Sequence, residues 1–164
     1  MLGRVIAAVA IFCGLQLGWQ ALGDTRIHRW VVDDATVGVA VAIVNHVTPA
    51  VNAQARGITM HAVGGGLNIV NGCEGTETWF MLCSAFVVAP LARRARFAGL
   101  ALGTLVVFGI NQLRVLALFY AIRNDAELFN LLHAVIGPIA VVLAVAGFFY
   151  GWMMHHAAPP AETA

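Results

Sequence analysis

Long runs of apolar residues, separated by short polar segments, dominate the hydrophobic pattern of this chain. About 20 consecutive apolar residues make a helix long enough to cross the hydrocarbon core of a bilayer. The pattern predicts four spans, at residues 5–23, 78–92, 97–122 and 128–154. The first segment has an alternative reading as a cleaved signal peptide, but its apolar stretch is long for one. We therefore expect an uncleaved anchor.

Two further segments have different patterns. Residues 30–51 are mostly valine and alanine but include two aspartates, Asn45, His46 and Pro49. This segment is predicted to be an interfacial helix or a fifth span, and the pattern leaves both open. From Ile58 to Val63, apolar and polar residues roughly alternate, and glycines 64–66 follow. That alternation predicts a short β-hairpin that turns on glycines.

Composition agrees with a membrane location. Hydrophobic residues make up 60% of the chain and charged residues only 10%, against about 25% charged in a typical soluble domain. We expect an all-α integral membrane protein with a single polytopic domain, 1–154, and a disordered tail, 155–164. The net charge is +1, so no basic excess favours a nucleic-acid partner. Three cysteines without a Cys-x-x-Cys pair favour neither a zinc site nor thioredoxin-like chemistry.

Arginines predict the orientation. Arg93, Arg94 and Arg96 fall in the short connection between two predicted spans, and such clusters mark the cytoplasmic side. The region 51–77 and the polar connection 123–127 then lie on the outer side, whether the chain has four spans or five.

Arg114 is the only charge within its predicted span. It lies about eight residues, or roughly 12 Å, below the outer end of that span. A charge inside a span costs about 2.5–3.5 kcal/mol on insertion scales, which makes it a functional candidate. The alternative is an arginine whose long side chain extends to the interface. Asn111 lies one turn earlier on the same face and is a possible partner.

His133 and Cys73 are predicted near the same outer surface. His133 lies one turn into the last span, where a structural hydrogen-bonding role is the alternative. Cys73 stands between Gly72 and Gly75 at the start of a span, where a helix N-terminus is expected to lower the pKa of its thiol. The alternative for Cys73 is a small buried hydrophobic residue.

Together these three residue types suit acyl transfer through a thioester. Cysteine supplies a nucleophile, histidine a general base and acid, and arginine a fixed cation for an oxyanion. Since the three segments meet the outer surface at similar depths, we expect Cys73, Arg114 and His133 to converge.

These residues also carry a family resemblance. The sequences Gly72-Cys73-Glu74-Gly75, Asn111-Gln112-Leu113-Arg114 and His133 through Gly137 resemble the three signatures of the exosortase/archaeosortase family. The resemblance implies a membrane-embedded cysteine protease or transpeptidase of the bacterial inner membrane, with its active site facing the periplasm. It assigns Cys73 as nucleophile, Arg114 as transition-state cation and His133 as base, and it implies no metal or cofactor.

The implied partners are the bilayer and exported proteins that end in a PEP-CTERM-type signal: a short motif, a transmembrane helix and a basic tail. Two features depart from the family. Glu74 stands where serine or asparagine is frequent, and an acid there should raise the pKa of the thiol. The chain also lacks several N-terminal spans of the large members, which suggests a compact subtype such as the H-type exosortases. The alternatives from other classes are a thiol-redox membrane protein and a non-enzymatic membrane subunit, scaffold or small transporter.

Overall fold

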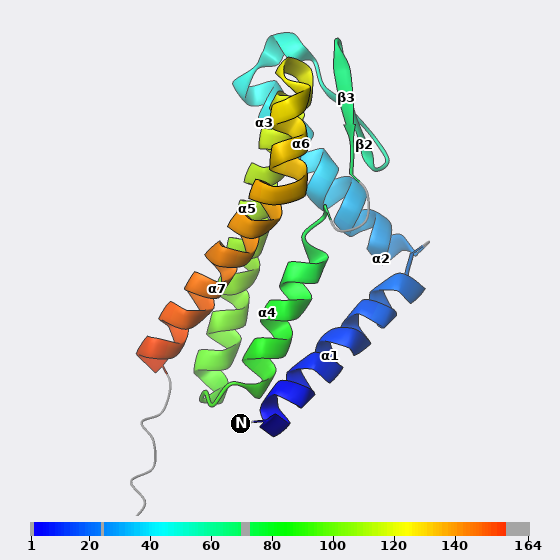
Figure 1. Ribbon diagram of the computed structural model, residues 1–164. Helices are drawn as coiled ribbons and strands as arrows, with labels where there is room; N and C mark the ends of the chain where they lie inside the picture. The colour runs from blue at the N-terminus through cyan, green and yellow to red at the C-terminus, as the bar shows by residue number, and fades with distance from the viewer. Residues whose placement is uncertain (1, 24, 70–72, 157–164) are drawn as a thin grey trace, which may run out of the picture.

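The computed structural model describes residues 2–23, 25–69 and 73–156, and most of them are helical (Figure 1). In chain order the elements are α1 (Leu2–Ala21), α2 (Arg26–Arg29), the π-helical η1 (Trp30–Gly38), α3 (Val39–Val47), the 3-10 turn η2 (Pro49–Val51), β1 (Gln54–Arg56), β2 (Thr59–Ala62), β3 (Gly65–Asn68), α4 (Thr76–Val88), α5 (Arg93–Asn124), α6 (Ala126–Leu131), the π-helical η3 (Leu132–Ile136) and α7 (Gly137–His156).

Four helices are long and apolar enough to cross a membrane, by length and composition: Leu2–Ala21, Arg26–Val47, Arg93–Asn124 and Ala126–His156. The prediction of an all-α membrane protein with about four such helices and a small sheet is confirmed. The set of four differs from the predicted one, because the segment 30–51 falls largely within the long helix Arg26–Val47.

The predicted span 78–92 is a shorter helix than expected. Helix α4 has 13 residues, which is about 20 Å at 1.5 Å per residue and less than a bilayer core. It ends at Val88 because Pro90 disfavours helical geometry in the residue before it, and Ala89 is extended at φ −65° and ψ 142°.

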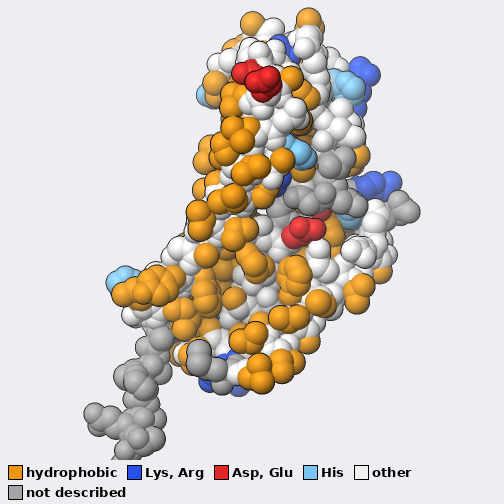
Figure 2. Space-filling view, viewed as in Figure 1, with side chains coloured by type: hydrophobic (Ala, Val, Ile, Leu, Met, Phe, Trp, Pro, Cys, Tyr) orange, Lys and Arg blue, Asp and Glu red, His pale blue; other side chains and the backbone are white. Residues whose placement is uncertain are grey.

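Helix α5 runs antiparallel to the long helix formed by α6, η3 and α7, and α4 packs between this pair and α1 (Figure 1). Hydrophobic side chains cover much of the α7, α4 and α1 surface in Figure 2, with basic side chains at the lower end. Helix α1 buries none of its residues. It packs on α4, where Gln16 Nε2 donates a hydrogen bond to Glu77 Oε1 at 3.2 Å.

The two ends of α5 differ from the predicted boundaries. Arg93, Arg94 and Arg96 form its first turn rather than a loop, and the Arg96 guanidinium donates to the Ala89 carbonyl at 3.0 Å. At the other end only Asp125 separates α5 from α6, where its carboxylate accepts hydrogen bonds from two backbone N–H groups of α6. The predicted tail also begins later: His155 and His156 belong to α7, and residues 157–164 lie outside the described ranges.

The sheet has the order β1-β2-β3 with antiparallel pairs. The predicted hairpin is present as β2 and β3, with Met60 opposite Leu67 and both side chains buried. Strand β1 was not predicted. Arg123 Nη1 donates to the Val63 carbonyl at 2.7 Å and fixes the hairpin tip to the end of α5. Strand β3 leads toward Cys73 and the start of α4.

Candidate active site

Helix α5 contacts Cys73 at two points. Asn111 Nδ2 donates a hydrogen bond to the Cys73 carbonyl at 3.1 Å, and Arg114 Nη2 donates to Cys73 Sγ at 3.9 Å. Asn111 and Arg114 are three residues apart and therefore project from neighbouring turns of one helix face. The predicted convergence of Cys73 with Arg114 is present, and Asn111 joins them.

Gly75 makes this approach possible. It has φ +82°, a left-handed conformation that glycine adopts readily and other residues rarely do. A Cβ atom at this position would lie 2.9 Å from Asn111 Cγ. Gly75 therefore both turns the chain into α4 and leaves room for Asn111. Gly72, the other predicted glycine of this motif, lies outside the described residues.

Gly137 has a similar relation to Arg114. Its N–H donates to the Leu132 carbonyl and closes the π-turn η3. A Cβ atom on Gly137 would lie 2.5 Å from the Leu132 carbonyl oxygen and 3.0 Å from Arg114 Nε. Only the absence of a side chain lets the π-turn and the guanidinium group occupy this space. The third predicted motif thus contacts the second through Gly137.

His133 lies within the same π-turn, four residues before Gly137. Because a π-helix has somewhat more than four residues per turn, His133 projects near the helix face that Gly137 presents to Arg114. Its ring stacks on Phe129 with centroids 5.6 Å apart, and its buried Nδ1 has no hydrogen-bond partner among the described residues. Within the described ranges His133 is not hydrogen-bonded to Cys73, so the predicted trio converges only in part.

Burial determines the state of the thiol. Cys73 is 6% exposed and belongs to the same apolar core as Val115 and Leu118. The pKa of Cys73 is raised from its ordinary value, chiefly by this burial; Arg114 lowers it, and Glu74 and Glu77 raise it. The expectation that the helix N-terminus would lower the pKa of this thiol is wrong, because loss of hydration outweighs the nearby positive charge.

Glu74 follows the thiol directly and is also buried, with 9% exposure. Its Oε1 accepts a hydrogen bond from Thr76 Oγ1 at 3.0 Å. The predicted effect of this acid on Cys73 is confirmed in direction.

Replacing Glu74 with glutamine should therefore lower the pKa of the Cys73 thiol, because the neutral amide no longer repels the thiolate. At pH values below that pKa, a lower pKa means a larger thiolate fraction, so alkylation by N-ethylmaleimide should be a few-fold faster. The measurement is the alkylation rate against pH in a Cys13→Ala, Cys83→Ala background. Glu77→Gln should shift the curve less, and a shift to higher pH for Glu74→Gln would contradict the electrostatic account.

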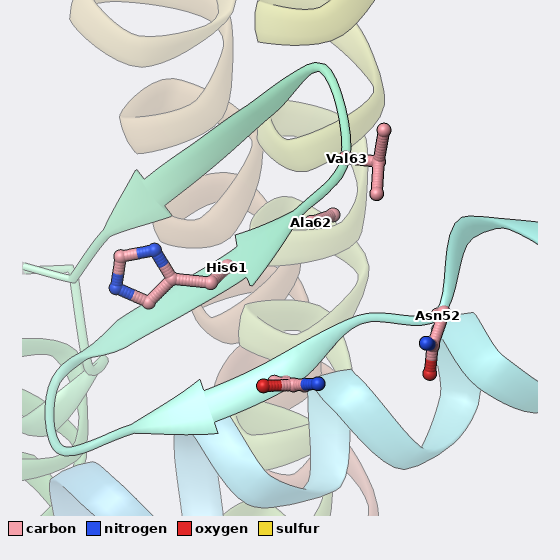
Figure 3. A pocket seen from close by; sticks show the side chains of 5 residues that line it. Asn52, His61, Ala62 and Val63 are labelled. Atoms are coloured by element: carbon pink, nitrogen blue, oxygen red, sulfur yellow. The ribbon is translucent and has the colours of Figure 1, made fainter.

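Two surface depressions lie elsewhere. One, of about 280 Å³, is lined on the sheet by Asn52, Gln54, His61, Ala62 and Val63 (Figure 3). It includes neither a thiol nor a cation. The other is an apolar groove of about 640 Å³ between α3 and α5. Its lining includes Gly109, Leu113 and Leu116 of α5 but neither Cys73 nor Arg114.

Gln112 is a buried polar residue that was not among the predicted site residues. This residue is 4% exposed, and its Nε2 donates to the carbonyls of Ala35 and Thr36 in η1 at 3.1 and 3.3 Å. The sequence does carry a signal for Gln112, since it is a second amide, next to Asn111, within an apolar span.

No cluster of three or more potential metal-ligating side chains occurs in the part of the chain that the structure describes. Cys13, Cys73 and Cys83 are free thiols. No family model, curated protein or solved structure matches this chain.

Proposed function

We propose that this protein is a membrane-embedded cysteine protease or transpeptidase of the exosortase type. The observation that carries the proposal is the contact between Arg114 Nη2 and Cys73 Sγ at 3.9 Å. This arginine, on a long apolar helix, lies against a thiol 41 residues away in sequence. A cation beside the thiol is also beside any oxyanion that forms when the thiolate attacks a carbonyl.

The raised pKa of Cys73 requires a base, because a thiol in this state is protonated near neutral pH. His133 is the base we propose, since its buried Nδ1 has no hydrogen-bond partner within residues 2–23, 25–69 and 73–156 and its helix contacts Arg114 through Gly137. His133 takes the thiol proton, sulfur bonds to the scissile carbonyl carbon, and Arg114 stabilises the oxyanion. The carbon–nitrogen bond then breaks, and His133 returns the proton to the leaving amine. Water or an acceptor amine resolves the thioester.

Helix lengths support an outer-surface location for this site. From Arg93 to Arg114 the helix rises about 31 Å at 1.5 Å per residue, close to the thickness of a bilayer core. With Arg93, Arg94 and Arg96 at the cytoplasmic face, Cys73 lies near the opposite interface. We propose a bacterial inner-membrane location with the site facing the periplasm. The substrates are exported proteins that end in a motif, a transmembrane helix and a basic tail.

A covalent adduct tests this function directly. The enzyme is co-expressed with a secreted protein from its own host that ends in such a signal, and membranes are quenched with acid. We expect an enzyme–substrate adduct that neutral hydroxylamine releases, as it does thioesters, together with a shortened substrate.

Cys73→Ala should abolish both the adduct and the shortened product, whereas Cys83→Ala should leave both unchanged. Unchanged processing by Cys73→Ala would exclude the cysteine mechanism and favour a non-enzymatic subunit. Loss of processing in Cys83→Ala as well would favour the thiol-redox alternative.

A further inference from the structure

We infer that Asn111 is a positioning residue, which holds Cys73 against Arg114 through the backbone of the cysteine. The inference rests on the proposed function in treating Cys73 as the nucleophile. Asn111 donates to the Cys73 carbonyl at 3.1 Å, and among the described residues its hydrogen bond goes to this backbone oxygen and not to the thiol. Its effect on the thiol is exerted through the main chain.

Burying the Asn111 amide has an unfavourable contribution to the free energy of folding, which supports a role beyond packing. The side chain is 2% exposed, and its Oδ1 is buried without a hydrogen-bond partner in the part of the chain that the structure describes. Leaving a buried acceptor unsatisfied is unfavourable, and an apolar side chain would avoid that loss. The amide orientation is unambiguous, since the atom that faces the Cys73 carbonyl must be the donor.

The packing of α5 against the turn before α4 allows this hydrogen bond. Gly75 leaves the space that the Asn111 side chain fills, so the turn before α4 and the face of α5 fit together only with a small residue there. Without this hydrogen bond, the backbone at Cys73 would be free to move, because Gly75 follows two residues later. With Asn111 in place, one helix face holds both the carbonyl and the sulfur of Cys73.

A double-mutant cycle on thiol reactivity tests the inference. The full chain in detergent, with Cys13→Ala and Cys83→Ala, is reacted with N-ethylmaleimide across pH. Arg114→Gln should slow alkylation of Cys73 near neutral pH about tenfold, the equivalent of one pKa unit. In an Asn111→Leu background the same Arg114→Gln change should alter the rate less than twofold, because the thiol is no longer held at the guanidinium group.

Two further variants keep the cycle decisive. Asn111→Ala removes the donor without adding charge or bulk beside Gly75, so it should uncouple the thiol from Arg114 in the same way. It decides the question if Asn111→Leu does not accumulate. Gln112→Leu is the matched control, because Gln112 is an equally buried amide on the next residue that contacts η1 instead. The Arg114 effect should remain about tenfold in this control.

The cycle separates this inference from the proposed function, because alkylation requires no substrate. If Arg114→Gln has the same effect with and without the Asn111 amide, the positioning role is overturned even where processing is normal. If the coupling is found but no sorting signal is processed, the protease proposal fails and the positioning of Cys73 stands. If Gln112→Leu also abolishes the effect of Arg114→Gln on the alkylation rate, Asn111 acts only through the general packing of α5 and has no specific positioning role.

Discussion

Replacing Arg114 with lysine is expected to leave a sorting-signal substrate almost entirely uncleaved while the enzyme inserts and accumulates normally. Lysine retains a positive charge on a long stem, so an anchoring role would survive the change. Stabilising an oxyanion is different, because guanidinium offers several donors in a rigid plane and ammonium is a mobile point charge. Losing one such donor costs on the order of 100- to 1,000-fold in rate.

The structure strengthens this expectation in two ways. Arg114 reaches Cys73 Sγ with a terminal nitrogen at 3.9 Å, while its Nε lies against the position of Gly137. Gly137 thus accommodates a planar guanidinium, and a lysine stem would not fill that space in the same way. The partial burial of this position also makes a lysine there prone to lose its proton, whereas arginine keeps its charge.

The measurement is the ratio of full-length to processed substrate on a blot, with enzyme level determined in the same membranes. Cys73→Ala gives the value for no processing. Near-normal processing by Arg114→Lys would reduce Arg114 to a structural residue and leave Cys73 and His133 as a dyad.

The membrane helices were predictable because apolar runs follow directly from the thickness of the bilayer. The exact ends were not, since they depend on single residues. Pro90 ends α4 after 13 residues, and an asparagine, histidine and two aspartates made 30–51 ambiguous although the helix is continuous to Val47. Strand β1 has three exposed residues and therefore carries no alternating pattern.

The candidate site could be predicted from the sequence because some of its residues are polar or charged and therefore rare in membrane helices. Arg114 and Cys73 were selected as a charge and a reactive thiol in improbable places, and the structure joins them. The burial of Cys73 was only an alternative in the sequence analysis, because Val115 and Leu118, which share its core, lie more than 40 residues later. That burial reverses the expected direction of the thiol pKa. The π-turn at Leu132–Ile136, which contains His133, likewise has no distinct sequence pattern.

Gly137→Ala should impair processing on the order of 100-fold, the second large effect we expect. The added methyl group would meet a backbone oxygen at 2.5 Å and Arg114 Nε at 3.0 Å, so the π-turn or the guanidinium group must move. Displacing a catalytic group by about 1 Å is enough for a loss of this size, whereas overpacking costs only about 1–3 kcal/mol of stability. Activity should therefore fall far more than thermal stability.

Gly147→Ala provides the matched control on the same helix. Apart from its own helix backbone, no described residue lies within 4 Å of a Cβ placed on Gly147, and replacing an unconstrained helical glycine with alanine is neutral or slightly stabilising. Processing is measured beside the midpoint of thermal unfolding in detergent for both variants. Equal processing by Gly137→Ala and Gly147→Ala would show that the contact between Gly137 and Arg114 does not position the guanidinium group. If only Gly137→Ala loses processing, and its midpoint of thermal unfolding is within a few degrees of that of Gly147→Ala, then the motif from His133 to Gly137 contributes to catalysis by positioning Arg114.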